Sequence, residues 1–386
     1  MHSLQEATKL IEEESQKWNC EEKWILLEEA ISHVLSEDLV ATSPHPSFSK
    51  SAMDGYVISE EGDTFTIAGE IAAGDSREVQ ISKGQCYRIF TGAKVPLNST
   101  RVVRQEFCES NNGVLRILRE DQSNVLRLGE DFQKGEVIVS KGTALHSAHI
   151  GLAAGQGIEK LRVFEKASVG ILSSGEELVP VSSIPGDSQI RNSNSPMLLS
   201  SLKHWNHPCK DWGITGDNQE ELVEVLHEAL GEHDVVILSG GASKGKYDLV
   251  KPACRALGVE FLIEGVRLRP GKPFSYGSFG SKGVFVLPGN PVAAYLTYLA
   301  LVQPFLEARN SLNTTPIPAV ASFQNKKTDF SCLIPARWKP GLGIEPVEFH
   351  GSGHIHALAN ADYCALIPEN CEEVKAGEIV QAIPIR

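Results

Sequence analysis

Three short apolar runs, each followed by a turn, stand out in the middle of the chain. They are Ser168–Ser174 (SVGILSS), Val235–Leu238 (VVIL) and Val284–Leu287 (VFVL). Runs this short and this apolar are typical of strands that are buried on both faces of a sheet. Helical patterns separate the runs, and strands that alternate with helices predict a parallel sheet. We therefore expect an α/β domain at residues 168–308.

Capping residues and amphipathic spacing predict the helices. After Asn218, a good N-cap, apolar residues recur on one helical face over Leu222–Leu230. Ser195–Pro196 predicts the start of an earlier helix, and Asn290 with Pro291 predicts the cap and first turn of a later one. The helical patterns with definable ends cover residues of about 3–18, 27–36, 146–155, 247–257 and 291–302.

Two other stretches consist of short alternating segments separated by glycine, asparagine and aspartate, which is typical of β-rich domains. They cover residues 56–142 and 319–386, and helical pattern resumes after the first, so the first reads as an insertion. The fold class is therefore multidomain α/β plus β. The predicted division is an N-terminal helical and linker region at 1–45 completed by 143–167, an inserted β-rich domain at 46–142, the α/β domain at 168–308 and a C-terminal β domain at 309–386.

The composition is that of a globular protein with several domains. The chain has 386 residues, 41% of them hydrophobic, and a net charge of −13, which disfavours general nucleic-acid binding. No apolar run reaches the roughly 20 residues that span a bilayer, and the charged N-terminus has no apolar signal core. The eight cysteines include no C-x-x-C pair, so we expect reduced thiols, no zinc site and a cytoplasmic location.

The ends of the predicted strands carry the candidate chemistry, because ligands bind beyond the carboxyl ends of parallel strands. Ser239, Gly240 and Gly241 form a loop whose free amides favour anions. The basic turn RLRPGKP at 267–273 offers cations to the same crevice, and the polar loop RNSNS at 191–195 offers hydrogen bonds to a heterocycle or sugar.

Four carboxylates at loop positions of the same domain predict that a metal ion binds there as well. They are Glu176, Glu177, Asp217 and Asp248. Carboxylates beside phosphates favour Mg²⁺, which predicts phosphoryl- or nucleotidyl-group chemistry on a phosphorylated small molecule. The chain has no GxxxxGK[ST] loop and no GxGxxG after a first strand, so a P-loop NTPase and a dinucleotide-dependent dehydrogenase are both unsupported.

A series of motifs in one order resembles a known family. They are SAMDGY, RIFTGA.VP, GED..KGE, ILSSGEEL, an SN pair near a helix start, DVVILSGG.S.G.YD, RPGKP, LPGNPV and GSG. Over residues 25–386 the chain resembles the molybdopterin molybdenumtransferases, the MoeA-type family that includes the E domain of gephyrin and its plant relatives. Each motif alone is modest, whereas the whole series is highly specific.

The resemblance implies an elongated four-part subunit and a homodimer whose cleft forms between two subunits. It implies a molybdopterin-binding α/β domain, an inserted β domain and a C-terminal β-barrel-like domain. The implied enzyme takes adenylylated molybdopterin and molybdate, hydrolyses the adenylate with Mg²⁺, releases AMP and leaves molybdenum on the dithiolene. Molybdopterin adenylyltransferase is the implied upstream partner, with neither nucleic acid nor membrane involved.

The strand-end reasoning and the resemblance together give one set of candidate site residues. The catalytic candidates are Asp54, Thr91, Glu177 and Asp248; the substrate-binding candidates are Asn192, Asn194, Asp217, Ser239, Gly240, Gly241, Pro288 and Pro291; the molybdate-binding candidates are Arg269, Lys272 and Ser352; the metal ligands are Asp217 and Asp248.

Two alternative functions are considered beside the transferase. One is a molybdopterin-binding scaffold without turnover, and the other is molybdopterin adenylyltransferase, whose α/β domain has a similar SGG loop. The acidic site residues and the extra β blocks favour the transferase, while molybdate and tungstate remain open as its oxyanion. Ala293 and Cys332 depart from the residues common in the family, serine and arginine, and Arg337 is a candidate to replace the missing arginine charge.

Overall fold

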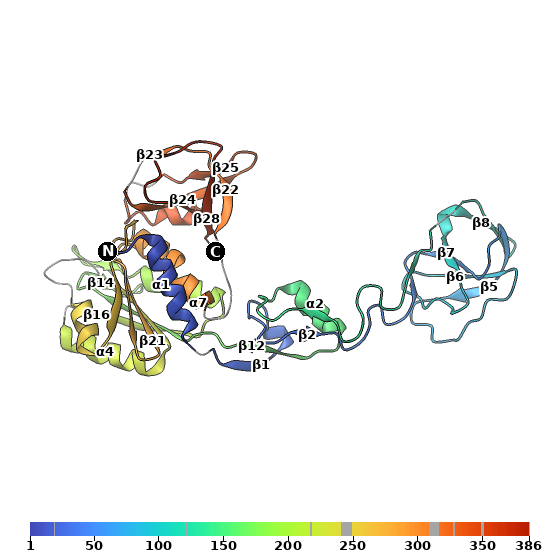
Figure 1. The fold of residues 1–386 in the computed structure, drawn as a ribbon, viewed down its shortest axis with the longest axis horizontal. Coiled ribbons are helices and arrows are strands. Elements are labelled where there is room, and N and C mark those ends of the chain that lie inside the picture. The colour runs from blue at the N-terminus through green and yellow to red at the C-terminus, as the bar shows by residue number, and fades with distance from the viewer. Residues whose placement is uncertain are drawn as a thin grey trace. The chain divides into compact units, whose positions relative to one another are not determined.

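Figure 1 shows the computed structural model, which describes residues 1–18, 20–119, 122–216, 218–240, 249–308, 316–326, 329–348 and 351–385. The chain folds into two compact units. Unit 1 comprises Met1–Ser36, Gly142–His146 and Leu161–Arg386, and unit 2 comprises Glu37–Lys141 and Ser147–Lys160. Among the described residues, no helix has both the length and the apolar character that crossing a membrane requires.

The centre of unit 1 is a mixed β-sheet. Its strands, in spatial order, are β16 (Cys209–Thr215), β13 (Val169–Ser174), β17 (Val235–Ser239), β21 (Lys282–Leu287), β20 (Ser275–Phe279) and β18 (Glu260–Glu264). Strands β16 to β21 run parallel, which confirms the predicted parallel α/β core. Strands β20 and β18 are antiparallel additions. Only the turn Gly280–Ser281 joins β20 to β21, and a connection that short forces a hairpin.

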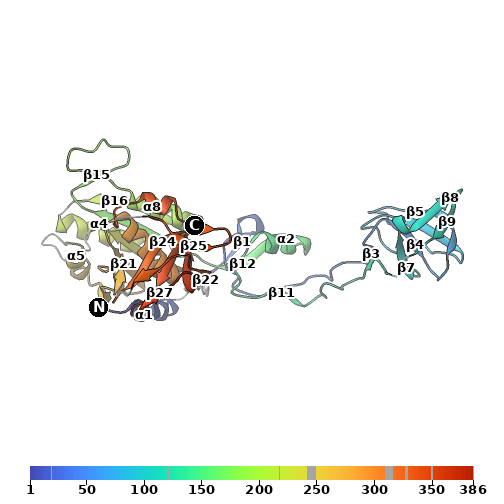
Figure 2. The same cartoon turned by 90° about the horizontal axis from the view of Figure 1, so that it is seen from above.

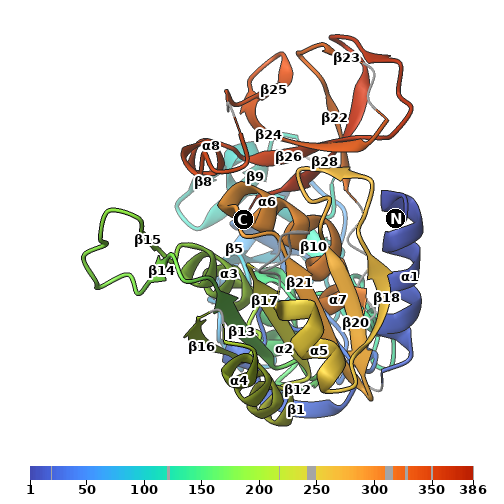
Figure 3. The same ribbon diagram turned by 90° about the vertical axis from the view of Figure 1, so that its left-hand side faces the viewer.

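Helices cover both faces of this sheet (Figure 3). One face packs against α1 (Leu4–Gln16), α3 (Asn194–His204), α6 (Pro291–Thr297), η3 (Tyr298–Val302) and α7 (Gln303–Ala308), and the other packs against α4 (Gln219–Glu232) and α5 (Val250–Ala256). Alternate residues of a strand point to opposite faces, so Ile171 and Ile237 contact the first group and Leu172 and Leu238 the second. Every residue from Val292 to Val302 is buried, as the all-round apolar pattern predicts.

Helix α1 begins with the capping box that its sequence predicts. The Ser3 hydroxyl accepts a hydrogen bond from the backbone N–H of Glu6 at 3.1 Å. In return, Glu6 Oε2 accepts from the backbone N–H of Ser3 at 2.7 Å. These two bonds satisfy donors that the first turn of a helix otherwise leaves unpaired. The strand pair β1 (Glu22–Leu26) and β12 (Lys160–Phe164) follows.

The second helix predicted in this region, at 27–36, is wrong. A single 3-10 turn, η1 (Leu27–Glu29), is followed by Ser32 at a φ of 64°, which a helix does not allow. Val34 and Leu35 then form isolated bridges to residues 144 and 163. Pairing with segments distant in the sequence therefore overrides the helical spacing of the apolar residues.

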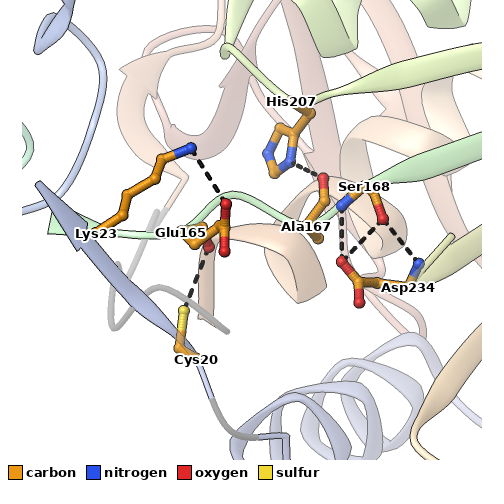
Figure 4. Close-up of polar contacts among 7 residues, drawn as sticks. All are labelled: Cys20, Lys23, Glu165, Ala167, Ser168, His207 and Asp234. Atoms are coloured by element: carbon orange, nitrogen blue, oxygen red, sulfur yellow. Dashed lines mark hydrogen bonds and ion pairs between the residues drawn. The ribbon is translucent and has the colours of Figure 1, made fainter. Parts of the chain in front are cut away.

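Polar contacts hold the segment that leads into β13 (Figure 4). Oδ2 of Asp234 accepts from the backbone N–H of Ser168 at 2.8 Å and from its hydroxyl at 3.0 Å. Nδ1 of His207 donates to the carbonyl oxygen of Ala167 at 3.0 Å. These contacts lie before β13 begins, so they fix the end of the strand opposite to its carboxyl end.

A second sheet of unit 1 is built mainly from C-terminal residues. Its strands are β19 (Leu268–Arg269), β24 (Ser331–Lys339), β26 (Tyr363–Ile367), β28 (Ile379–Pro384) and β22 (Ile317–Val320), with β25 (Gly343–Pro346) paired to β24. The pair β23 (Asn325–Lys326) and β27 (Glu373–Val374) and the helix α8 (His356–Ala359) complete this part. Parallel pairing of β19 with β24 places Arg269 opposite Cys332, so the basic turn of the α/β domain is tied to the C-terminal sheet.

Unit 2 is β-rich and has its own core. Its main sheet runs β7 (Arg101–Arg104), β4 (Gly55–Ile58), β6 (Gln85–Ile89), β5 (Thr64–Ile71), β9 (Val114–Ile117) and β8 (Cys108–Asn111). It also contains η2 (Gln105–Phe107), α2 (Ser147–Gly155) and two strand pairs, β2 (Leu39–Val40) with β11 (Val137–Val139) and β3 (Lys50–Ser51) with β10 (Val125–Leu126). Val57 and Ile58 of β4 are fully buried on opposite faces of the sheet, each within a separate apolar cluster.

Candidate functional site

The carboxyl ends of the central strands lie level with one another. Ser173 of β13 pairs in register with Ser239 of β17, which in turn pairs with Leu287 of β21. The loops that follow therefore meet at one edge of the sheet, and we call residues 174–177, 240 and 288–290 the strand-end loops. Strand β13 lies between β16 and β17, so the order of strands reverses there, which is where open α/β sheets bind ligands.

Gly240 allows two strand-end loops to approach each other closely. Its φ is 99°, and a Cβ atom at this position would lie 2.1 Å from the carbonyl oxygen of Ser174. A Cβ atom on Gly289 would in turn lie 3.6 Å from the Gly240 Cα atom. No other amino acid combines this backbone conformation with so little space. Gly240, predicted to bind the substrate, therefore also allows the loops at the carboxyl edge of the sheet to pack together.

Asn194 joins the loops that follow β17 and β21. Its side-chain N–H₂ group donates to the Ser239 hydroxyl at 2.7 Å and to the Gly289 carbonyl oxygen at 2.8 Å. The residue is 8% exposed, and its side-chain oxygen Oδ1 is buried without a hydrogen-bond partner among the described residues. A buried acceptor without a donor costs about 1–3 kcal/mol, so this oxygen is well placed to receive an N–H or O–H group of a ligand.

The side-chain amide of Asn192 bonds to two neighbouring serines of the protein. Its N–H₂ group donates to the hydroxyls of Ser173 and Ser195 at 3.0 and 3.1 Å, and its Oδ1 accepts from the backbone N–H of Ser195 at 3.3 Å. Ser195 therefore lies inside the first turn of α3, which begins at Asn194, and does not cap it as predicted. Sequence reasoning missed Ser173 and Ser195, since only the fold brings these hydroxyls to Asn192.

Glu177 lies exposed at the end of β13, where its carboxylate folds back over Gly175. A Cβ atom on Gly175 would lie 2.7 Å from Glu177 Oε2. The backbone carbonyl of Glu177 accepts from Ile190 at 2.7 Å. Here a ribbon begins, formed by β14 (Leu178–Val179) and β15 (Ile190–Arg191), whose connection extends away from the sheet (Figures 2 and 3). The carboxylate is accessible to a ligand at the strand-end loops.

The basic turn presents two exposed cations around one aromatic ring. The Arg269 guanidinium carbon lies 4.4 Å from the centre of the Phe330 ring, and the Lys272 ammonium nitrogen lies 5.9 Å from it. Gly271, at a φ of 128°, packs so closely on α6 that a Cβ atom would lie 2.6 Å from Thr297 Oγ1. The turn is therefore seated on the helix that begins at Pro291, and both of its cations are exposed, where an anion can reach them. Phe330 is a residue that the motifs did not indicate.

The residues that depart from the family pattern, and Arg337 as the candidate replacement, lie in different surroundings. Ala293 is 4% exposed, so it is packed in the protein core. Arg337 does not replace a charge next to Arg269, because its guanidinium pairs with Glu345 at 2.7 Å between β24 and β25. The position opposite Arg269 is taken by Cys332, whose thiol donates to the Phe330 carbonyl oxygen at 3.6 Å.

Ser352 lies against the start of α6. Its hydroxyl accepts from the side-chain N–H₂ group of Asn290 at 2.8 Å, and its carbonyl oxygen accepts from the backbone N–H of Val292 at 3.0 Å. Pro291 occupies the first helical position, as predicted. Pro288 is buried, whereas Asn290 is exposed and Ser352 is partly exposed, so the two hydrogen bonds tie Ser352 to the strand-end loop that contains Asn290.

In unit 2 the structure brings Asp54 and Thr91 together. Oδ1 of Asp54 accepts from the backbone N–H of Thr91 at 2.8 Å and from its hydroxyl at 2.7 Å. These two bonds, the backbone one first, hold the pKa of the Asp54 carboxyl below its ordinary value. Asp54 is therefore ionised at neutral pH and has one oxygen, Oδ2, outside this pair of bonds.

Replacing Thr91 with valine is expected to raise the pKa of Asp54, but only part of the way to its ordinary value of 3.8. The variant loses the hydroxyl bond and keeps the larger backbone contribution. Since the folded pKa is depressed, the stability that Asp54 provides is present above its unfolded pKa and is lost as pH falls through the folded pKa. In the variant the folded pKa lies closer to the unfolded one, so this loss is smaller in total and is complete at a higher pH.

Titration of the Asp54 carboxyl carbon by NMR measures this shift. Thr100→Val is the matched control, because the Thr100 hydroxyl donates to the Ile58 carbonyl oxygen and to no carboxylate that the structure describes. An Asp54 pKa that is equal in the Thr91→Val variant and the unmodified protein would contradict the assigned cause.

Three candidate residues, Asp217, Gly241 and Asp248, lie outside the described residues. Within the described part of the chain, no group of three or more histidine, cysteine, aspartate or glutamate side chains gathers in a way that could hold a metal ion. The predicted Mg²⁺ ligands, Asp217 and Asp248, therefore stay a prediction.

Family profiles match three consecutive parts of the chain. The profile of the MoeA N-terminal region (domain I and II) matches residues 2–157. The profile described as "Probable molybdopterin binding domain" matches residues 170–308, and that of the MoeA C-terminal region (domain IV) matches residues 323–385.

Full-length relatives are similar over nearly the whole chain. The molybdopterin molybdenumtransferase of Staphylococcus epidermidis is 31% identical over 377 residues, covering 93% of this chain and 90% of the relative. The enzyme of the same name from Haemophilus influenzae is 30% identical over 378 residues, covering 94% and 93%. The crystal structure of the molybdopterin biosynthesis MoeA protein from Pyrococcus horikoshii OT3 superimposes with a TM-score of 0.84 at 25% identity and covers 100% of both chains.

Proposed function

This chain belongs to the MoeA family, and we propose that it catalyses the Mg²⁺- and molybdate-dependent hydrolysis of adenylylated molybdopterin. As a molybdopterin molybdenumtransferase it acts in molybdenum cofactor biosynthesis, in the insertion of molybdenum into molybdopterin. The proposal adds the adenylylated form of the substrate, the release of AMP and the residues that carry the reaction.

The observation that carries the proposal is the side-chain oxygen of Asn194, next to Ser239, which has no hydrogen-bond partner in the described part of the chain. A pterin ring offers N–H groups that can donate to such an oxygen. Because the Asn194 N–H₂ group donates to the Ser239 hydroxyl, that hydroxyl keeps its own hydrogen for an acceptor of the ring. An acceptor and a donor side by side match the alternating donors and acceptors of a pterin edge.

The proposed reaction has two balanced parts. In the first, water attacks the adenylyl phosphorus, the bond from this phosphorus to the bridging oxygen breaks, and AMP leaves with the oxygen of the water. In the second, the two thiols of molybdopterin replace one oxide of molybdate, and that oxide leaves as water with the two thiol protons. Molybdenum keeps its oxidation state throughout.

Each group of residues has a proposed role in these steps. Arg269 and Lys272 hold the molybdate dianion by charge, together with the Ser352 hydroxyl. Glu177 is an exposed residue of the strand-end loops and would orient water or a phosphate-bound metal there. Bound Mg²⁺ would neutralise phosphate charge. Asp54, ionised and held by Thr91, is proposed as a further catalytic carboxylate.

We also propose a homodimer, the four-domain division given by the sequence, a cytoplasmic location and molybdopterin adenylyltransferase as the upstream partner. Exposed apolar residues on β1, Trp24 at 60% and Leu26 at 41%, support an interface between subunits. None of the eight cysteines, all of which lie among the described residues, is in a disulfide, as expected in a reducing compartment. Sedimentation of an active monomer would contradict the dimer.

The test of the proposed function is AMP release from adenylylated molybdopterin with Mg²⁺, measured with and without molybdate. We expect release that depends on molybdate, and an Asp248→Ala variant serves as the inactive control. Tight binding without release would instead indicate a scaffold, and formation of adenylylated molybdopterin from molybdopterin and ATP would indicate an adenylyltransferase. Tungstate in place of molybdate tests the choice of oxyanion.

A further inference from the structure

Asn290 does not act as the side-chain cap that its position before α6 predicts. Its side chain makes no capping bond to the helix. Instead its Nδ2 donates to Ser352 Oγ at 2.8 Å, a contact between residues that are 62 positions apart in the chain. A second bond, from the Val292 N–H to the Ser352 carbonyl oxygen at 3.0 Å, holds the same residue. Two bonds thus fix one serine of the C-terminal part onto the α/β domain.

The direction of the Asn290 bond decides what the Ser352 hydroxyl can do. A serine hydroxyl has one hydrogen to donate and lone pairs that accept. Because Asn290 supplies the hydrogen of their shared bond, the hydrogen of Ser352 remains available for another acceptor. Among the described residues Ser352 Oγ donates to no acceptor, and its side chain is partly exposed. The hydroxyl is therefore set up as a donor, which is what an oxyanion requires.

We propose that Asn290 is a positioning residue for molybdate, which keeps the Ser352 hydroxyl oriented as a donor to one molybdate oxygen. The inference rests on the proposed function of Ser352 and adds a residue with no previously assigned role in the reaction. Asn290 acts through Ser352 and does not itself contact the substrate. An aspartate at position 290 would reverse the bond, because a carboxylate accepts the serine hydrogen, and it would also place a negative charge near the dianion.

The experiment is a double-mutant cycle on molybdate-dependent AMP release. We expect Asn290→Ala to raise the KM for molybdate about tenfold, the size of one hydrogen bond, with kcat nearly unchanged. In the Ser352→Ala background the same substitution is expected to add nothing, because the hydroxyl it positions is gone. Asn290→Asp, which keeps the shape of the side chain, is expected to exceed the effect of Asn290→Ala. Calorimetric titration of each variant with molybdate gives the same comparison without turnover.

Asn360→Ala is the matched control, an exposed asparagine at the end of α8 whose side chain bonds within its own turn. It is expected to leave the KM for molybdate unchanged. An equal effect of Asn290→Ala in the presence and absence of the Ser352 hydroxyl would overturn the proposal, as would wild-type behaviour of Asn290→Asp. If the wild-type protein itself shows no response to molybdate, the proposed function falls and this inference with it; a responsive wild type with an indifferent Asn290→Asp refutes the inference alone.

Discussion

Replacing Gly240 with alanine is expected to reduce molybdate-dependent AMP release to about 1% of the wild-type rate or less. The new Cβ atom would lie 2.1 Å from the Ser174 carbonyl oxygen, and the backbone would have to hold an L side chain at a φ of 99°. The carbonyl belongs to the main chain, so the clash is relieved only if the ends of β13 and β17 move apart. That movement displaces Ser239 and breaks the geometry of Asn194 at the strand-end loops.

The same substitution is expected to lower the free energy of unfolding by about 3 kcal/mol, from the unfavourable φ and the displaced loops together. Activity and urea denaturation of the purified variant measure the two effects. Gly231→Ala, in helix α4, is the matched control, because its Cβ atom meets nothing within 4 Å and its φ is not positive. It is expected to be neutral or to stabilise by about 0.5–1 kcal/mol. Full activity of Gly240→Ala would show that the strand-end loops tolerate separation.

Local patterns were sufficient where the local sequence determines the structure. The buried strands β13, β17 and β21 were predictable from their apolar runs, because a strand covered on both faces needs no polar alternation. Their shared carboxyl edge follows from parallel packing, so the sequence alone indicates Ser239 and Gly240 as candidates. The capping box of α1 and the N-cap of α4 at Asn218 were local in the same sense.

The sequence-based predictions are wrong where contacts between segments far apart in the sequence determine the local structure. Leu27, Ala30 and Val34 have helical spacing, yet Val34 pairs with residue 144, which no local pattern reveals. The residues around Asn290 predict a helix cap. Its side chain instead bonds to Ser352, which lies between β25 and α8 in the C-terminal part of the chain. Arg337 is a candidate from the sequence to replace the missing arginine charge. The fold instead pairs it with Glu345 on the neighbouring strand, which no local pattern indicates.

The site residues divide in the same way. One motif contains both Asn192 and Asn194. It does not reveal that the side chain of Asn192 bonds to Ser173 and Ser195. Nor does it say that the side-chain oxygen of Asn194 has no partner within the part of the chain that the structure describes. The difference arises from which hydroxyls the sheet brings next to each amide, and this is a property of the register between strands rather than of the motif.

Removing both cations of the basic turn, with Arg269→Ala and Lys272→Ala combined, is expected to raise the KM for molybdate by about a thousandfold. A hydrogen bond to a charged group contributes about 1.5–3 kcal/mol, so each substitution alone is expected to cost about 10- to 100-fold. Arg269→Lys is expected to be intermediate, because it keeps the charge but loses the planar, forked donor group. Since both side chains are exposed, the melting temperature should change little.

The measurement is initial-rate kinetics over a range of molybdate concentrations, repeated at higher ionic strength. Salt screens attraction between the exposed cations and the dianion, so it should weaken molybdate binding in the wild-type protein and have less effect in the double variant. Arg337→Ala is the matched control, since this arginine lies on the same C-terminal sheet but pairs with Glu345. Equal losses for Arg337→Ala and Arg269→Ala would mean that the net charge of the surface attracts molybdate. A loss confined to Arg269 and Lys272 would place the oxyanion at the Phe330 side of this turn, which packs against α6, the helix that follows Asn290.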